Sequence, residues 1–373
     1  MIIGSADTGN GMCNVFVRDN SGRIHGFQLP SIRASVTGDS LGLGKRELSF
    51  EWVETPEGRF VVGDDVMRIS RRRVEMHQSL LRYGDGVHMF LTDVTIAKIM
   101  QKFHVKPEPI DLTVFCPPGV YARRKNKIKK EFLDHRAYIQ FKRDKNPRTW
   151  TYRSVTVWPE GLGAIACFVL NENGEQVPTN ALSGRNLVID LGVLTSDHFI
   201  IQDGQFNPEA FQTSTDGGIK SHVLLPVLRD LQRESSQFDH FNWCDIDEVL
   251  RRWLKRKSTC FPSKSRNPCD KCKQDCQLYG PQNTVKLGRM FESRCNLYAN
   301  WVANVIIDTG YEASRTCRSV IVVGGGAALI QKHLRQMYGD LIFDHSAVET
   351  LKGVRLMDMN AAGGLRMALA NQH

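Results

Sequence analysis

One short pattern occurs twice in this chain, about half a chain length apart: an apolar strand, an Asp-x-Gly turn and a second strand. The first copy is IIGSADTGNGMCNVFV at residues 2–17, and the second is LVIDLGVLTSDHFII at residues 187–201. Asn and Gly accept the positive φ angles that tight turns need, so both copies predict β-hairpins. A repeat over this distance predicts two similar lobes, each of which presents one hairpin to the same ligand.

A third glycine-rich turn follows a strand predicted at residues 319–323. Gly324, Gly325 and Gly326 lead through Ala327 into a segment with helical character. Where a strand turns into a helix, glycines let the backbone approach a planar or phosphorylated ligand because no Cβ intervenes. The Walker A and Rossmann loops need a helix directly after their glycines, and the predicted hairpin at residues 2–17 therefore fits neither.

The three turns together contain the groups that a Mg²⁺-bound nucleoside triphosphate needs. Backbone N–H groups of the hairpins would bind the phosphates, while Asp7 and Asp190 would hold the hydrated Mg²⁺, for which one or two carboxylates commonly suffice. Glu160 follows an extended stretch and precedes a predicted helix start, where a carboxylate is placed to hold an attacking water. Structural roles fit these acids as well, because Asp before Gly is common in turns and Glu160 would interact with the helix dipole.

Composition limits the class of protein. The 373 residues, 41% of them hydrophobic, suffice for two lobes. No apolar run reaches the roughly 20 residues of a membrane span and the N-terminus has no signal-peptide pattern, so we expect a cytosolic protein without membrane contact. The net charge is +9, and basic residues cluster at residues 71–73, 123–130 and 251–257. Such clusters favour nucleic acid or another acidic surface, and solvated helix faces are the alternative.

Four of the ten cysteines lie close together in a polar segment at residues 258–282. Cys260, Cys269, Cys272 and Cys276 have the spacing C-x8-C-x2-C-x3-C, in which a Cys-x2-Cys pair with two further thiols favours a tetrahedral Zn²⁺ site. A structural zinc would order a loop that has no apolar core. Free thiols and transient disulfides are the alternatives, although a reducing compartment disfavours disulfides.

The order of these motifs resembles that of the actin-like ATPases, and most closely that of the plasmid-segregation ParM group. DTGNGMC at residues 7–13 resembles the first phosphate hairpin of the family, and DLG at 190–192 with Thr195 and Asp197 resembles the second. VVGGGA at 322–327 resembles the adenosine motif, and WPEG at 158–161 resembles the segment with the catalytic glutamate. With LTVFCPP at 112–118 and FVVGD at 60–64, the resemblance extends over most of the chain.

The resemblance implies an α/β fold with two actin-like lobes, a duplicated ribonuclease H-like architecture, and a nucleotide cleft between them. Residues 1–184 and 348–373 would form the first lobe, in which NAAGG at 360–364 resembles the crossing segment of the family. Residues 185–347 would form the second lobe, with the Cys-rich insertion at 258–282. It also implies an ATPase that polymerises into filaments for plasmid segregation. The implied partners are further copies of the chain and a DNA-bound adaptor, and the basic clusters leave direct DNA contact open.

The resemblance also assigns roles to individual residues. Glu160, Asp190 and Asp7 would be catalytic, with Mg²⁺ held by Asp7 and Asp190 through water. The residues implied to bind ATP or ADP are Asp7, Thr8, Gly9, Asn10, Gly11, Asn14, Gly192, Thr195, Gly324, Gly325, Gly326 and Ala327.

The sequence makes two departures from the family pattern. Asn14 stands where a Lys or another polar residue is usual, so one phosphate contact would be absent or supplied differently. Val193-Leu194 replaces a small Gly-Gly pair, which restricts the backbone and adds bulk near the γ-phosphate. The second departure predicts slow hydrolysis or a different path of the loop.

Two other functions remain open from the sequence. A metabolite kinase of the same superfamily would need a catalytic Asp for a substrate hydroxyl, and the sequence does not identify one. A nucleic-acid-binding module, in which a degenerate nucleotide site only holds the lobes together, is favoured by Val193-Leu194 and the basic clusters.

Overall fold

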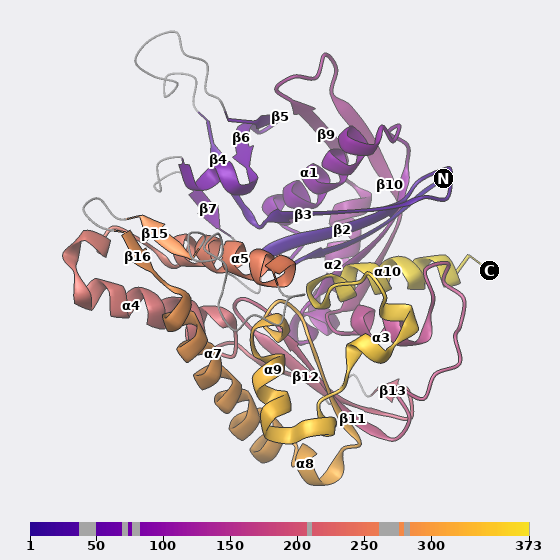
Figure 1. The fold of residues 1–373 in the computed structure, drawn as a ribbon. Helices are drawn as coiled ribbons and strands as arrows, with labels where there is room; N and C mark the ends of the chain where they lie inside the picture. The colour runs from indigo at the N-terminus through magenta and orange to yellow at the C-terminus, as the bar shows by residue number, and fades with distance from the viewer. Residues whose placement is uncertain are drawn as a thin grey trace. The chain divides into compact units, whose positions relative to one another are not determined.

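The computed structural model describes residues 1–36, 50–68, 74–76, 83–206, 211–260, 276–279 and 284–372. These residues form two compact units (Figure 1). The first unit contains residues 1–182, 211–213 and 345–372, and the second contains residues 183–206 and 214–344. The expected lobe boundaries at 184/185 and 347/348 lie near these breaks, whereas nothing in the sequence indicates the short return at 211–213.

The first unit is built on a mixed sheet. Its described strands are β1 (Ile2–Thr8), β2 (Met12–Arg18), β3 (Ile24–Pro30), β4 (Ile32–Ser35), β5 (Trp52–Thr55), β6 (Gly58–Val62), β7 (Val74–Met76), β8 (Ile110–Cys116), β9 (Arg136–Phe141) and β10 (Arg148–Pro159). They follow the order β3-β2-β1-β8-β10-β9-β5-β6-β4-β7. β1 pairs antiparallel with β2 and parallel with β8, which pairs parallel with β10. Parallel neighbours run in the same direction, so the carboxyl ends of β1, β8 and β10 lie at one edge of the sheet.

Helices cover both faces of this sheet. α1 (Gly86–Phe103) and α2 (Pro118–Leu133) pack on one face, and their apolar residues share a core with Ile2 of β1. α10 (Met359–Ala370) packs on the other face, where Leu365 and Leu369 contact Ile3. Successive side chains of a strand point to opposite faces, which is why Ile2 and Ile3 belong to different cores. Each fully buried aliphatic side chain contributes about 1.5–3 kcal/mol to folding.

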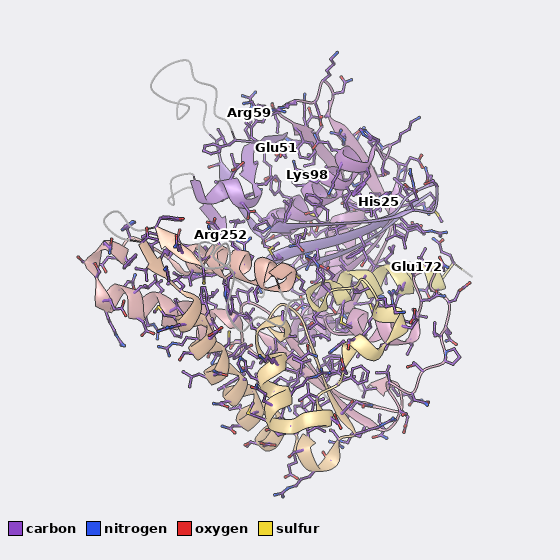
Figure 2. All side chains as sticks on the ribbon, in the orientation of Figure 1. His25, Glu51, Arg59, Lys98, Glu172 and Arg252 are labelled. Carbon is purple, nitrogen blue, oxygen red and sulfur yellow. The ribbon has the colours of Figure 1, made fainter. Side chains whose placement is uncertain are left out.

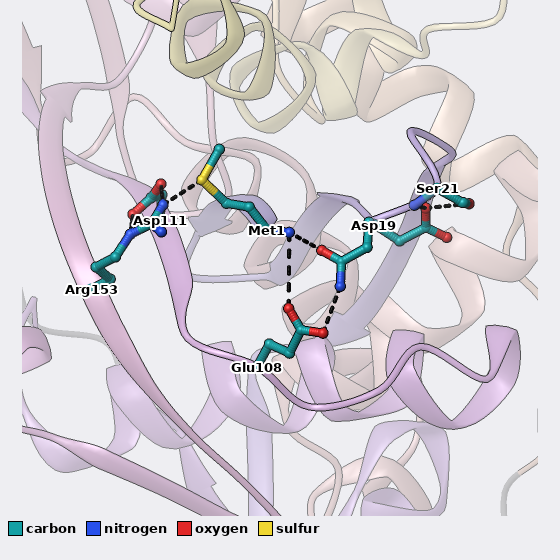
Figure 3. A network of polar contacts seen from close by, with 7 residues as sticks. Met1, Asp19, Ser21, Glu108, Asp111 and Arg153 are labelled. Carbon is teal, nitrogen blue, oxygen red and sulfur yellow. Dashed lines mark hydrogen bonds and ion pairs between the residues drawn. The ribbon is translucent and has the colours of Figure 1, made fainter.

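Polar contacts tie the amino ends of the parallel strands together (Figure 3). Arg153 of β10 forms an ion pair with Asp111 of β8, and Asn20 donates from Nδ2 to Glu108 Oε1 at 2.6 Å. The amino group of Met1 contacts Asn20 and lies 3.9 Å from Glu108 Oε2. Burial acts to raise the pKa of Asp111, but hydrogen bonds, chiefly from Arg153, outweigh it and hold the pKa below its ordinary value. These contacts fasten the edge of the sheet opposite to the first predicted phosphate hairpin.

Charged and aromatic contacts hold the β5 side of the sheet to α1. Lys98 Nζ of α1 lies 2.6 Å from Glu51 Oε2 and 4.3 Å from the ring centre of Phe141 on β9. Arg59, labelled with Lys98 and Glu51 in Figure 2, stacks its guanidinium on Trp52 at 4.7 Å. The Lys98 side chain is only 12% exposed, so its cation–π contact contributes on the order of 1 kcal/mol.

α3 (Leu162–Val169) follows β10 and crosses α10 at glycines. An ideal Cβ on Gly163 of α3 would lie 2.2 Å from the carbonyl oxygen of Asn360. An ideal Cβ on Gly363 of α10 would lie 1.7 Å from the carbonyl oxygen of Gly163. Any side chain at either position would therefore push the two helices apart.

α10 also caps α3 at both ends. The Asn360 side-chain oxygen accepts from the backbone N–H groups of Gly161 at 2.9 Å and of Ala164 at 3.3 Å. At the other end, Arg366 is buried and donates to the carbonyl groups of Cys167 at 3.0 Å and of Leu170 at 2.8 Å. Groups at helix ends that lack a partner within the helix are thus satisfied from a segment far away in the sequence. Three short 3-10 turns, at residues 345–347, 349–351 and 356–358, precede α10, so the C-terminal helix begins at 359.

The second unit has a smaller sheet with the same strand plan. Its strands are β11 (Arg185–Leu191), β12 (Ser196–Gln202), β13 (Gln205–Phe206) and β17 (Ser319–Val323), in the order β13-β12-β11-β17. β11 pairs antiparallel with β12 and parallel with β17, as β1 does with β2 and β8. The predicted α/β class and the predicted duplication are therefore confirmed by the strand topology.

Helices and short strands complete the second unit. They are α4 (Leu225–Glu234), α5 (Trp243–Cys260), α7 (Gly288–Trp301), α8 (Ala313–Thr316), α9 (Ala327–Tyr338), the π-helical turns Lys220–Leu224 and Val302–Gly310, and the hairpin of β15 (Gln277–Tyr279) and β16 (Thr284–Lys286). The short strand β14 (Gln212–Ser214) spans one break between the units. Residues 258–260, expected in an irregular insertion, continue α5, because the preceding Leu, Lys and Arg residues favour helix.

Candidate functional site

The first predicted phosphate loop is a β-hairpin turn at the carboxyl edge of the first unit's sheet. Residues 9–11 form the turn between β1 and β2. The Ser31 hydroxyl donates to the carbonyl of Gly9 at 2.6 Å, and the Ser31 N–H donates to the carbonyl of Gly11 at 2.9 Å. These bonds hold the backbone of the turn in one conformation, and a fixed set of N–H groups is what binds an anion well.

The side chains of this hairpin are engaged by the protein itself. Asp7 and Asn14 are cross-strand partners, and Asn14, only 5% exposed, donates from Nδ2 to the carbonyl of Met357 at 3.1 Å. The fully buried hydroxyl of Thr8 lies 2.9 Å from Thr92 Oγ1 of α1. Of the predicted nucleotide-binding residues here, Thr8 and Asn14 thus position the hairpin with their side chains, and Asp7 is the acid that the hairpin brings to the edge.

Glu160 lies at the same edge of the sheet as Asp7. β10 ends beside Cys116 of β8, and the Glu160 N–H donates to the Cys116 carbonyl at 2.9 Å. The hydroxyl of Tyr83, a residue that is 1% exposed, donates to Glu160 Oε1 at 2.7 Å. β1 and β10 are separated by β8, and neighbouring strands lie about 4.8 Å apart, so the strand that carries Asp7 and the strand that ends before Glu160 are about 10 Å apart.

Asp190 has the corresponding place in the second unit. It is the second-last residue of β11, paired beside Val323 of β17, and it is 7% exposed. Gly324 has a φ of +83°, and an ideal Cβ there would lie only 2.3 Å from Asp190 Oδ1. The glycine turn is therefore built around the Asp190 carboxylate, and one unit brings together the second hairpin and the predicted adenosine motif.

The three glycines after β17 differ in how closely the rest of the unit packs on them. An ideal Cβ on Gly326 would lie 2.6 Å from Leu191 Cβ, and the Gly326 N–H donates to the Leu191 carbonyl at 2.8 Å. Gly324 is crowded by Asp190, as described above. An ideal Cβ on Gly325, in contrast, would meet only Ile219 Cδ1, at 3.9 Å. Packing within the unit therefore explains Gly324 and Gly326 but leaves Gly325 unexplained.

The departure Val193-Leu194 lies in the turn of the second hairpin, which packs on another glycine pair. The Gly192 N–H donates to the Thr195 carbonyl at 2.9 Å, and the Lys220 N–H donates to the Val193 carbonyl at 2.8 Å. An ideal Cβ on Gly218 would lie 2.4 Å from the Val193 carbonyl oxygen. The turn keeps its hairpin form because Gly218 makes room for it. The predicted effect on hydrolysis stays a prediction.

Tyr298 of α7 contacts the glycine pair at 217–218, on which this turn packs. Its hydroxyl donates to the carbonyl of Gly217 at 2.7 Å. Burial, and secondly the negative charge of Asp190, raise the pKa of Tyr298. The phenol therefore stays protonated, and keeps donating this hydrogen bond, throughout the neutral pH range.

Two residues of these sites were not predicted. Tyr83 contacts Glu160 from 77 positions away in the sequence, and no spacing rule links a tyrosine to a carboxylate over that distance. Gly218 belongs to the sequence DGG at 216–218, which indicates a turn, and that signal does not reveal which backbone packs against it.

Most of the predicted zinc site lies outside the described residues. This holds for Cys269 and Cys272, and of Cys260 only the backbone is described, at the end of α5. Cys276 is buried, its carbonyl accepts from the Leu287 N–H at 2.8 Å, and burial raises the pKa of its thiol to about 12. In the described ranges no three or more His, Cys, Asp or Glu residues are grouped to hold a metal ion. The zinc site stays a prediction.

Two units with the same strand plan, an acidic hairpin in each and a glycine turn packed against one of them define an actin-like fold. More specifically, the fold is ParM-like, and the predicted resemblance is confirmed at this level. Bacillus thuringiensis ParM solved with AMPPNP has 15% identity and a TM-score of 0.69, with 100% of this chain and 99% of that chain covered. The archaeal actin homologue Ta0583 has 19% identity and a TM-score of 0.62, with both chains fully covered.

A Bacillus thuringiensis ParM hybrid that contains two ParM mutants, solved with ADP, has 15% identity and a TM-score of 0.68. This chain spans 48% of the length of that hybrid. At such identities the similarity shows the fold alone. No protein-family model and no curated protein sequence matches the chain. In the described part of the chain, no helix has both the length and the apolar character to cross a membrane.

Proposed function

We propose that this chain is an actin-like ATPase that binds ATP or ADP with Mg²⁺ and polymerises in a nucleotide-dependent way. The observation that carries the proposal is the duplicated edge: a hairpin with Asp7 in one unit and a hairpin with Asp190 in the other. Bacillus thuringiensis ParM, which has this fold, has been solved with AMPPNP, ATP and ADP.

The residues at both edges fit a magnesium nucleotide. The Asp190 carboxylate lies in a cradle that a side chain on Gly324 would fill, and carboxylates are the ligands that hydrated Mg²⁺ prefers. Asp7 and Asp190 would hold the ion through water, and the bound ion would neutralise phosphate charge. The turns at residues 9–11 and 192–195 would bind the phosphates through backbone N–H groups. Gly325, which packing does not require, would give the adenosine close access to the backbone.

Glu160 would orient the water that attacks the terminal phosphate. Its backbone is fixed by the hydrogen bond to Cys116, and its carboxylate receives the Tyr83 hydroxyl. A carboxylate held in this way can accept a proton from the water as the phosphate bond breaks. Turnover would be slow if Val193-Leu194 crowds the γ-phosphate.

Nucleotide binding is tested with the substitution Gly325→Val. A bulky side chain here is expected to weaken ATP binding at least tenfold in calorimetry, because the adenosine loses its approach to the backbone. The fold should be retained, since an ideal Cβ at this position meets only one atom, at 3.9 Å. Gly339→Ala, in the same unit, is not a suitable control, because Gly339 has a φ of +55° and an alanine there would strain the backbone. Lys332→Gln, an exposed change on α9, is the matched control and should bind ATP as the parent does.

Polymerisation is tested by light scattering at 90 degrees with ATP, ADP and no nucleotide. The proposal predicts that the scattered intensity rises when ATP is added, and that the Asp190→Asn variant shows no such rise. Glu160→Gln should still polymerise with ATP but release phosphate at least tenfold more slowly, so that its filaments persist longer. If the scattered intensity of the parent protein does not depend on the nucleotide, the polymerisation part of the proposal is rejected and only the nucleotide-binding part remains.

The cellular role that we propose is segregation of plasmid DNA in the cytoplasm through a DNA-bound adaptor protein. A fluorescent fusion should form cytoplasmic filaments, and the Asp190→Asn fusion should stay diffuse. Filaments that form equally well with Asp190→Asn would count against nucleotide control.

We also propose that Cys260, Cys269, Cys272 and Cys276 hold a structural Zn²⁺. The spacing of the four thiols supports this, and Cys276 is anchored at the start of the β15–β16 hairpin. Metal analysis of protein purified without added metal should find about one zinc per chain, and Cys272→Ser should lose it. A zinc content unchanged by that substitution would reject this set of ligands.

A further inference from the structure

Helix α2 presents a strongly basic surface to solvent. Its 16 residues contain six cations and one acid, Glu131. The cations that are exposed are Arg123, Lys125, Lys127, Lys129 and Lys130. Over the residues that the structure describes, none of these five makes an ion pair, so no carboxylate of the described chain neutralises them.

The opposite side of α2 anchors it firmly. Val120, Ile128 and Phe132 are buried against the sheet of the first unit. Lys125 Nζ lies 5.1 Å from the ring centre of Tyr121, which is partly buried. The basic face therefore stands on a helix whose backbone is already ordered, so binding a partner costs side-chain but little backbone conformational entropy.

The five cations form two rows along the helix. Successive residues of an α-helix are about 100° apart, so Arg123, Lys127 and Lys130 fall within about 60° of each other. Lys125 and Lys129 fall within about 40° of each other, on the other side of the exposed surface. The crest between the two rows carries small or uncharged side chains, namely Ala122, Asn126 and Leu133.

This arrangement matches the charge pattern of duplex DNA. The major groove is about 12 Å wide and admits an α-helix, and a phosphate backbone runs along each side of it. A helix with cations on both flanks and uncharged residues along its crest can approach the groove while each row contacts one backbone.

We propose that α2 binds duplex DNA directly, with its crest toward the major groove and one row of cations on each phosphate backbone. Five contacts of this kind make binding strong at low salt and independent of base sequence. The interaction needs neither the nucleotide nor the filament, and it lies on the first unit alone. It would bring a segregating filament onto DNA without relying on the adaptor for every contact.

The test measures binding of the full chain to a fluorescent 20-base-pair DNA duplex by anisotropy, without nucleotide, at several salt concentrations. Five phosphate contacts predict that affinity falls about 500-fold between 50 and 200 mM salt. The combined substitutions Arg123→Gln, Lys127→Gln and Lys130→Gln leave two contacts, for which the expected fall is about 12-fold.

A matched control removes the same charge elsewhere. Lys106, Arg143 and Lys145 are exposed residues of the first unit outside α2, and changing all three to Gln should leave the salt dependence near that of the parent. Asp190→Asn should also bind DNA as the parent does, so failure of the nucleotide site and failure of this surface are distinguishable. An RNA duplex of equal length should bind more weakly, because its major groove is narrow and deep.

Three results would overturn the proposal. The first is no binding of the parent protein to DNA at 50 mM salt. The second is an equal loss of salt dependence in the α2 variant and the Lys106, Arg143, Lys145 control, which would indicate general attraction of a basic protein. The third is an α2 variant that binds DNA normally but no longer polymerises, which would make this face a contact between copies of the chain.

Discussion

The crossing of α3 and α10 allows a quantitative prediction for Gly163→Ala. In an ordinary helix this substitution stabilises by about 1 kcal/mol, because Ala has the higher helix propensity. Here the new methyl group would lie 2.2 Å from the carbonyl oxygen of Asn360, about 1 Å inside normal contact. The obstacle is backbone, so α10 has to move away from α3.

The expected cost follows from what that movement breaks. Overpacking of this kind costs about 1–3 kcal/mol. The shift also lengthens the two hydrogen bonds from Gly161 and Ala164 to Asn360, now 2.9 and 3.3 Å, each of which contributes about 1 kcal/mol. After the gain in helix propensity is subtracted, we expect Gly163→Ala to destabilise the first unit by about 2–4 kcal/mol.

The assay is equilibrium unfolding in urea, followed by circular dichroism, with the midpoint and slope compared between variants. Gly86→Ala is the matched control, because an ideal Cβ at that first position of α1 meets only Glu57 Oε1, at an ordinary 3.6 Å. The control should be neutral or up to about 1 kcal/mol more stable. If Gly163→Ala and Gly86→Ala unfold within 0.5 kcal/mol of each other, about the resolution of such comparisons, the reasoning about this helix crossing is refuted.

Two further predictions concern Tyr83 and His198. Tyr83→Phe keeps the ring and removes the hydroxyl that contacts Glu160. The kcat for ATP hydrolysis should therefore fall about 10- to 100-fold with KM nearly unchanged, as expected for a lost hydrogen bond of about 1.5–3 kcal/mol to a charged group. An unchanged rate constant of hydrolysis in single-turnover assays would exclude the positioning role. Burial lowers the pKa of His198 to about 4, so the folded state stays neutral while the unfolded state takes up a proton below about pH 6.5. The stability from this residue is complete above about pH 6.5 and is lost as the pH falls toward 4, by about 3 kcal/mol in total. In the His198→Gln variant, the urea midpoint of unfolding should change less between about pH 6.5 and pH 4. An equally steep decrease of the midpoint in the variant would show that other groups cause it.

Local patterns in the sequence predicted the elements that carry the site. The hairpins at residues 2–17 and 187–201 and the strand-to-helix turn at 324–327 were predicted from glycine placement and strand periodicity, and the structure contains all three. These signals are reliable because a tight turn depends on the φ angles of the few residues within it. The same local reasoning placed Glu160 at the end of a strand.

The contacts that hold the site in place were beyond such reasoning. Tyr83 reaches Glu160, Asn360 caps α3 and Gly218 accommodates Val193, and each contact joins residues far apart in the sequence or depends on which backbones meet. The length of α5 was also mispredicted at residues 258–260, since the Cys and Pro content of the following segment hid the helix propensity of the residues before it. Turn chemistry is local, whereas close packing depends on the completed fold.

The capping of α3 by α10 has a consequence for synthesis on the ribosome. Gly161 and Asn360 are 199 positions apart, and the whole second unit is translated between them. At about 5–20 residues per second, the nascent chain spends on the order of 10–40 s with Glu160 already made but its supporting helix without its end caps. A newborn subunit would thus complete the capped α3 that follows Glu160 only after α10 has emerged, and under the proposed function incomplete chains would lack a finished site for hydrolysis.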